Sequence, residues 1–186
     1  LTKVPYPCVL KGQILSGKRG KAGAVRVVKS EEELKEVKEI IEKITINGKS
    51  MEGIIACGFL PIVEEYYMGM TLDVKNRAVI MLFTPFGGMD IEELATTSPE
   101  KLMRLDCTEG FDEAAFRESA KIFELPDERL NKIVDIAKKL STACFALDST
   151  TIEVNPLAVL EDGSVVAIDA KLVIDDNSLY RQEDYT

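Results

Sequence analysis

The sequence of 186 residues contains no histidine. This absence excludes Ser-His and Cys-His catalysis, zinc sites with histidine ligands and a phosphorylated histidine on this chain. Cysteine is scarce: four residues, far apart and without C-x-x-C spacing, indicate neither a zinc cluster nor a redox pair. No apolar run approaches the roughly 18 to 20 residues that cross a bilayer. With 46% hydrophobic residues, the chain is expected to be globular with a substantial core.

Acidic side chains are missing from residues 1–30, although the net charge of the whole chain is −9. This segment contains seven Lys and Arg residues, so the remaining 156 residues carry a charge of −16. The asymmetry indicates a cationic segment that meets an anion, on a body acidic enough to repel nucleic acid. A solvated basic face would give the same charge count. Because the chain starts at Leu1 without a signal-like region, we expect it to be part of a longer polypeptide.

Hydrophobic patterning predicts strand pairs interspersed with helices. Strands are expected at 8–15, 24–28, 53–57, 65–72, 78–83, 151–160 and 164–173, and helices at 31–44, 89–94, 112–123 and 127–147. Ser30 and Glu33 are spaced as a capping box for the first helix. Since antiparallel pairs alternate with helices, the sequence predicts an α+β fold rather than a doubly wound parallel sheet.

Residues 16–23, SGKRGKAG, form a loop rich in glycine and cations. Glycines three residues apart let backbone N–H groups approach a ligand, and Lys18, Arg19 and Lys21 can neutralise phosphate oxygens. Lys11, in the middle of the preceding strand, needs a partner because a buried charge is costly. The loop is not a P-loop, because Arg19 occupies the Ser or Thr position and a strand follows. An exposed, solubilising hairpin with Lys11 as a snorkelling edge residue is the alternative.

The last two predicted strands are joined by a turn at residues 161–163. A three-residue turn places Asn155 opposite Asp169 and Glu153 opposite Lys171, with opposed side chains on one face. Amide and carboxylate oxygens suit Mg²⁺, which commonly takes few protein ligands and completes its shell with water and phosphates. A two-residue turn would shift the register and separate these side chains. The alternative to a metal site is a polar stripe that faces solvent.

Five motifs together resemble one known family. They are VLKGQ at 9–13, SGKRGKAG at 16–23, GGMDIEE at 87–93, IEVNPL at 152–157 and DAKLVIDDNSLYRQ at 169–182. In this order the motifs resemble the ATP-grasp domain of the β subunit of succinate–CoA ligases, also called succinyl-CoA synthetases. The resemblance covers nearly the whole chain.

The resemblance implies an ATP-grasp fold of two lobes, with mixed or antiparallel sheets and the nucleotide between the lobes. Residues 1–60 would form a small lid lobe with the basic loop, and residues 61–186 a larger lobe with the magnesium hairpin. The implied activity is that of an acid–CoA ligase: a phosphoryl group passes between Mg²⁺-ATP or Mg²⁺-GTP and a histidine on a partner α subunit. Neither nucleic acid nor a membrane is an expected partner, and the implied location is the bacterial cytoplasm or the mitochondrial matrix.

The resemblance also implies roles for single residues. Contacts to the nucleotide would come from Lys11, Lys18, Arg19, Gly20, Cys57 and Glu65. Asn155 and Asp169 would hold Mg²⁺. The catalytic candidates, which would face the incoming phosphohistidine, are Gly87, Gly88 and Glu153.

Two positions depart from the family pattern. Lys18 stands where the family loop has a small glycine, and Cys57 aligns with an acidic residue of the nucleotide pocket. These departures prompt one alternative interpretation, a degenerate nucleotide-binding or assembly module. The other alternative is a related ligase for another acid, such as malate, citrate or acetate, because the family's contacts to the acid and to CoA lie largely outside this sequence. The family's opening helical segment and its C-terminal domain have no counterpart in this sequence.

Overall fold

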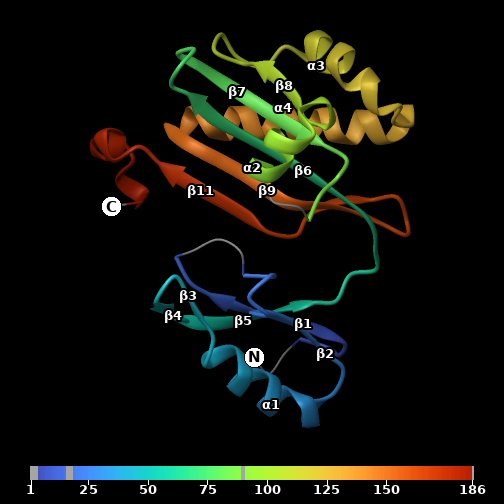
Figure 1. Cartoon of the computed structure of the whole chain (residues 1–186), viewed down its shortest axis with the longest axis vertical. Helices are drawn as coiled ribbons and strands as arrows, with labels where there is room; N and C mark the ends of the chain where they lie inside the picture. The colour runs from blue at the N-terminus through green and yellow to red at the C-terminus, as the bar shows by residue number, and fades with distance from the viewer. Residues whose placement is uncertain (1–3, 16–18, 89–90, 186) are drawn as a thin grey trace. The chain divides into compact units, whose positions relative to one another are not determined.

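The computed structural model describes residues 4–15, 19–88 and 91–185 (Figure 1). The chain divides into two compact units, unit 1 (Leu1–Pro61) and unit 2 (Ile62–Thr186). All strand pairs in the described ranges are antiparallel, and helices pack on the sheets, which confirms the predicted α+β class. No helix within these ranges is long and apolar enough to span a membrane.

Unit 1 is a three-stranded sheet with one helix on it. The strand order is β2-β1-β5, and the elements are β1 (Cys8–Gln13), β2 (Val25–Val28), β5 (Gly53–Gly58) and α1 (Glu31–Glu42). A two-stranded ribbon, β3 (Thr45–Ile46) and β4 (Lys49–Ser50), was not predicted, because strands of two residues give no periodicity to read.

Alternation along β1 gives the sheet of unit 1 two different faces. Cys8 and Leu10 pack with Val28 and Ile41 in a buried cluster under α1. Lys11, one residue along the strand, therefore points to the opposite face.

The predicted capping box at the start of α1 was wrong. Ser30 is the N-cap, but its side chain makes no capping hydrogen bond. Glu33 Oε2 instead accepts a hydrogen bond of 2.9 Å from the backbone N–H of Lys29. The carboxylate reaches one residue further back than a capping box requires, so it satisfies a donor that precedes the helix.

Unit 2 contains a six-stranded sheet in the order β10-β9-β6-β7-β8, with β11 also paired to β9. Its strands are β6 (Ile62–Asp73), β7 (Ala78–Thr84), β8 (Met103–Asp106), β9 (Ser149–Leu160), β10 (Val165–Ala167) and β11 (Ala170–Ile174). Its α-helices are α2 (Ile91–Thr97), α3 (Glu113–Ala120) and α4 (Asp127–Ala146), and 3₁₀ turns occupy Pro99–Lys101, Lys121–Phe123, Asp176–Arg181 and Glu183–Tyr185. Short β8 was not predicted.

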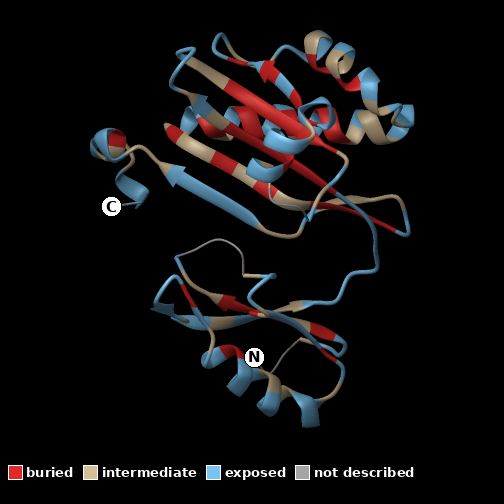
Figure 2. Cartoon of the chain, viewed as in Figure 1, coloured by how far each residue is buried: buried red, intermediate tan, exposed pale blue. Residues whose placement is uncertain are grey.

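The helices of unit 2 lie on opposite faces of its sheet (Figure 1). Tyr66, Met68 and Met70 of β6 point into a core with α3 and α4, which is the red interior in Figure 2. Tyr67 points the other way and clusters with Ile80, Leu82 and Leu102, against which Ile91 of α2 packs. We call this second side the α2 face of the sheet.

A β-bulge interrupts β9 where it pairs with β6. Tyr66 is opposite Leu157 and Met68 is opposite Val154, so the two residues Asn155 and Pro156 oppose the single residue Tyr67. A bulge of this kind changes which residues of a strand point to each face. Val154 and Leu157 consequently both reach the α4 core although they are three residues apart.

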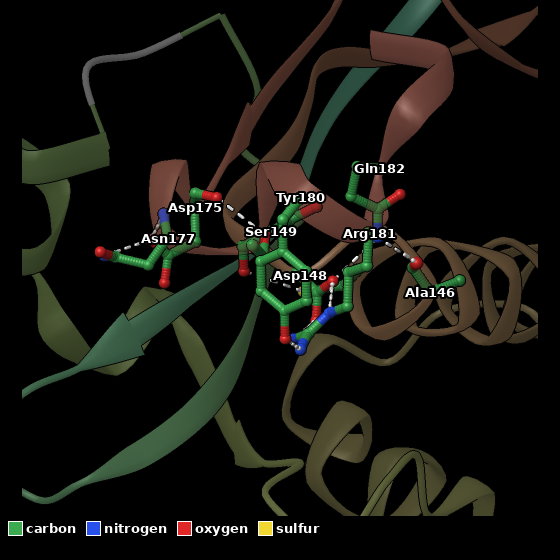
Figure 3. A network of polar contacts seen from close by, with 10 residues as sticks. Ala146, Asp148, Ser149, Asp175, Asn177, Tyr180, Arg181 and Gln182 are labelled. Atoms are coloured by element: carbon green, nitrogen blue, oxygen red, sulfur yellow. Dashed lines mark hydrogen bonds and ion pairs between the residues drawn. The ribbon is translucent and has the colours of Figure 1, made fainter. Parts of the chain in front are cut away.

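The segment after β11 is fixed to the end of α4 by two polar side chains. Arg181 forms two hydrogen bonds with the Asp148 carboxylate, Nε to Oδ2 at 2.7 Å and Nη2 to Oδ1 at 2.5 Å (Figure 3). Gln182 Nε2 donates to the same carboxylate at 2.8 Å and to the carbonyl of Ala146 at 3.0 Å. These side chains attach the last 3₁₀ turns to the body of unit 2.

The Asp148 network predicts a loss of stability in acid. Hydrogen bonds from Arg181 and Gln182 lower the pKa of the Asp148 carboxyl to about 2. A lowered pKa contributes stability above the unfolded value of about 4, and the contribution disappears as the pH falls through the folded value. Asp148→Asn should therefore be less stable than wild type at pH 5–7 but equally stable near pH 2. Urea denaturation across this pH range measures the difference in free energy of unfolding between the two proteins. A difference that does not change with pH would contradict the lowered pKa of Asp148.

Candidate functional site

In unit 1, Lys11 is embedded in an apolar sheet face. It is 8% exposed, on the side of the sheet that α1 does not cover. Val25 and Ile55 are its neighbours in register on β2 and β5. Cys57 is paired with Val9 and so shares this face. The face thus combines one cation with partly exposed aliphatic side chains, Ile55 being 47% exposed.

The end of the basic loop folds back onto β1. Arg19 Nη1 donates to the carbonyl of Gly12 at 3.3 Å, and the carbonyl of Arg19 accepts from Ala24 N–H at 2.9 Å. Gly20 accepts a hydrogen bond of 3.0 Å from the N–H of Gly23, whose φ of +77° suits glycine. Arg19 is thereby attached to the strand that carries Lys11. Lys18, the remaining predicted contact of this loop, lies outside the described residues.

In unit 2, the structure brings together three residues to which the resemblance gives different roles: Glu65, a nucleotide contact, and Gly87 and Gly88, which would face the phosphohistidine. Gly87 N–H donates to the carbonyl of Glu65 at 2.6 Å. A Cβ on Gly87 would lie 2.5 Å from the Glu65 carbonyl carbon, so only glycine allows this approach. Gly88 has a φ of +70°, and a Cβ there would meet Glu65 Oε2 at 2.5 Å. The turn that precedes α2 is therefore packed directly on Glu65.

The hairpin register predicted from the turn at residues 161–163 was correct. Lys171 is paired with Glu153, and their side chains approach to 3.9 Å. The N–H of Asn155 donates to the carbonyl of Asp169 at 3.0 Å, as expected if these two residues oppose each other. Both Asn155 and Asp169 are half-buried. In the described ranges, no three His, Cys, Asp or Glu side chains gather at a metal-binding distance.

Tyr67 is a residue of this face that the sequence reasoning missed. Its hydroxyl donates to Glu153 Oε2 at 3.2 Å. Glu65, Tyr67 and Glu153 thus lie on neighbouring strands, β6 and β9, near the start of α2. The sequence signal for Tyr67 was its hydroxyl-bearing side chain two residues after Glu65. Because side chains alternate along a strand, Tyr67 and Glu65 lie on the same face of the sheet.

A concave region of unit 2 lies away from these residues. It has a volume of about 590 Å³ and is lined by Asn76, Arg77, Ala78, Asp106, Thr108, Glu109, Gly110, Phe111 and Asp112. These residues belong to the β6–β7 turn and the connection from β8 to α3, and the region contains none of the predicted site residues. The candidate site is therefore defined by side chains on the sheet faces rather than by this cavity.

Comparison with known proteins identifies related sequences and folds. A family model described as an ATP-grasp domain matches residues 4–159. The subunit beta of an ADP-forming succinate–CoA ligase from Wolbachia sp. subsp. Brugia malayi is 37% identical over 182 residues, which cover 93% of this chain and 47% of the relative. The subunit beta of a GDP-forming succinate–CoA ligase from Thermus thermophilus is 36% identical, and the match covers 95% of this chain and 47% of the relative. The chain spans about half the length of the curated relatives it matches.

Solved structures agree on the fold. ATP citrate lyase from Methanothrix soehngenii matches with a TM-score of 0.70 and 23% identity, over 95% of this chain and 40% of that one. An acetyl-coenzyme A synthetase from Ca. Korarchaeum cryptofilum matches with a TM-score of 0.68 and 17% identity, over 92% of this chain and 78% of that one. At these identities the likeness concerns the fold alone.

Proposed function

The chain belongs to the ATP-grasp domain family, and from this premise we propose that it is the nucleotide-binding part of the β subunit of a succinate–CoA ligase. The observation that carries the proposal is the 37% identity to such a subunit along 93% of the chain. The partner would be an α subunit that supplies the reactive histidine. The absence of histidine from this chain fits that division.

The residues of unit 1 would bind the nucleotide. The cation of Lys11, set among aliphatic side chains, suits a ligand that joins an apolar ring to an anion. Arg19 and the backbone at Gly20 would contact phosphate oxygens, which Arg binds through paired N–H groups. Lys18 is proposed for the same loop, and Glu65 of unit 2 and Cys57 are proposed as further contacts to the nucleotide.

The hairpin of unit 2 would hold Mg²⁺ at Asn155 and Asp169. One amide and one carboxylate, both partly exposed, are the hard oxygen donors that Mg²⁺ prefers when phosphates and water complete its shell. When bound, Mg²⁺ would neutralise charge on the phosphate oxygens during transfer.

The proposed step moves the terminal phosphoryl group of the nucleotide to the partner's histidine. The bond from phosphorus to the bridging oxygen of the nucleoside diphosphate breaks, and a bond from phosphorus to an unprotonated imidazole nitrogen forms. This chain would contribute positioning and cationic stabilisation rather than a covalent intermediate. Glu153, with a side chain 25% exposed, and the Gly87–Gly88 turn would face the incoming histidine.

Nucleotide-dependent melting tests the binding half of this proposal. In the full gene product, Mg²⁺-ADP at about 100 times its Kd should stabilise the fold by about 2.7 kcal/mol and raise the melting temperature. Lys11→Met should weaken Mg²⁺-ADP about 10- to 100-fold, because it removes a charged contact to phosphate. Lys35→Met, on α1 and so on the other side of the sheet, is the matched control and should bind as wild type does.

Two outcomes would speak against the proposal. If millimolar Mg²⁺-ADP leaves the melting temperature of wild type unchanged, the chain is not a working nucleotide-binding domain. If Lys11→Met and Lys35→Met bind equally well, the apolar face of unit 1 is not the binding face. The acid is a separate question, which a panel of succinate, malate, citrate and acetate with the reconstituted α and β subunits would answer.

A further inference from the structure

On the α2 face of the sheet, a buried hydroxyl is directed at the carboxylate of Glu153. Tyr67 is 5% exposed, and its Oη donates to Glu153 Oε2 at 3.2 Å. Burial raises the pKa of Tyr67, and the nearby charge of Glu153 raises it further. The phenol consequently remains protonated at neutral pH and acts as a donor to the carboxylate.

Gly69 leaves the space through which this contact is made. It is paired with Glu153 across β6 and β9 and is two residues from Tyr67 on the same face. A Cβ at Gly69 would lie 2.6 Å from Tyr67 Oη and 3.1 Å from Glu153 Cβ. Any larger residue would therefore stand where the Tyr67 hydroxyl now lies.

The other oxygen of Glu153 is approached from a different strand. Lys171 of β11 is paired with Glu153, and its Nζ is 3.9 Å from Oε1. The Lys171 side chain is 61% exposed, so it lies at the rim while the Tyr67 hydroxyl lies beneath. The buried contact is the better fixed of the two, because a well-exposed ion pair holds its geometry weakly.

We propose that Tyr67 is a positioning residue for phosphoryl transfer: its hydroxyl fixes the Glu153 carboxylate in the orientation that receives the partner's histidine. This inference rests on the proposed function, in which Glu153 faces that histidine. Fixing a catalytic group matters because a displacement of about 1 Å can slow a reaction 100-fold.

The neighbouring tyrosine provides a matched control. Tyr66 is also buried, but it points to the α4 side, where its Oη donates to Glu64 Oε2 at 2.6 Å and accepts from Arg129 Nη1 at 3.0 Å. Tyr66→Phe and Tyr67→Phe remove the same atom from adjacent residues on opposite faces. A general effect on the fold would follow either change, whereas an effect on Glu153 would follow only the second.

The experiment uses the full gene product assembled with its α subunit and measures single-turnover phosphorylation of that subunit from labelled Mg²⁺-ATP. Tyr67→Phe should slow the transfer about 10- to 100-fold, while the Kd for Mg²⁺-ATP stays within about twofold. Tyr66→Phe should leave the rate within about twofold. In a Glu153→Gln background, adding Tyr67→Phe should change the rate by less than about twofold, because the two residues act through one contact.

A wild-type rate of phosphorylation in Tyr67→Phe overturns the inference. So does a loss of rate in Tyr66→Phe that equals the loss in Tyr67→Phe. The third contradicting result is that Tyr67→Phe slows the Glu153→Gln variant as much as it slows wild type. If Tyr67→Phe does not fold, Gly69→Ala tests the same contact by filling its space, and a wild-type rate there overturns the inference too. Absence of any phosphorylation by the wild-type complex instead contradicts the proposed function, so the two failures are distinguishable.

Discussion

Asp169→Ala is expected to reduce nucleotide-dependent phosphoryl transfer at least about 100-fold. The structure joins Asp169 to Asn155 by a backbone hydrogen bond of 3.0 Å, and we propose these two side chains as the protein ligands of Mg²⁺. The proposed site has two protein ligands and loses one of them in this variant. Even the mutation of a residue that hydrogen-bonds to a metal ligand typically lowers metal affinity or activity 10- to 100-fold. The measurement is the steady-state rate as a function of Mg²⁺ concentration at saturating nucleotide.

Asp176→Ala is the control for this loss. Asp176 is an exposed acid of the 3₁₀ turn that follows β11, so its removal changes the charge by the same amount without touching the hairpin pair. It should retain the wild-type rate and Mg²⁺ dependence. If Asp169→Ala and Asp176→Ala have the same activity, Asp169 is not a metal ligand and the hairpin is a solvent-facing polar stripe.

Gly87→Ala is expected to destabilise the fold by about 2 to 3 kcal/mol, because overpacking against well-packed atoms has costs of this size. The added Cβ would lie 2.5 Å from the carbonyl carbon of Glu65 and 2.6 Å from the nitrogen of Tyr66. Backbone atoms of a central strand cannot move aside as the end of a side chain can. The hydrogen bond of 2.6 Å from Gly87 N–H to the Glu65 carbonyl would be lost as well. Urea denaturation gives the change in free energy of unfolding.

Gly53→Ala is the matched substitution for Gly87→Ala. A Cβ at Gly53 meets nothing within 4 Å, and the backbone there is not left-handed. Its stability should remain within about 1 kcal/mol of wild type or rise slightly, since alanine restricts the unfolded chain. Equal free energies of unfolding for the two variants would show that the turn before α2 can move away from Glu65 without cost.

Local signals in the sequence were sufficient for the hairpin and for one face of unit 1. The turn at residues 161–163 fixed the pairing of Glu153 with Lys171, because one register follows from a loop of known length. The position of Lys11 within a strand predicted a charge that would need a partner, and the structure buries that side chain. Both inferences depended on residues close together in sequence.

Contacts between distant segments could not be predicted in the same way. The approach of Gly87 to Glu65 joins the end of β7 to the middle of β6, and nothing in either motif specifies how closely they pack. Tyr66 and Tyr67 are chemically identical neighbours, so composition did not show which one faces Glu153. The strand β8, with four residues, was too short for alternation to distinguish it from a loop.

The bulge at Asn155 and Pro156 restricts where this hairpin can change length. Before it, Glu153 is on the α2 face; after it, Leu157 and Val159 are in the core, although all three have odd numbers. Deleting one of the two bulge residues would make the pairing with β6 regular, but Ile168 and Asp169 on the other side would then oppose a single residue. The pairing of Asn155 with Asp169 would be disrupted. Insertions at residues 161–163 lengthen only the turn, so the side chains of both strands stay on the faces of the sheet where they now lie. Among homologues, we therefore expect gaps and insertions to collect at that turn and to spare the bulge.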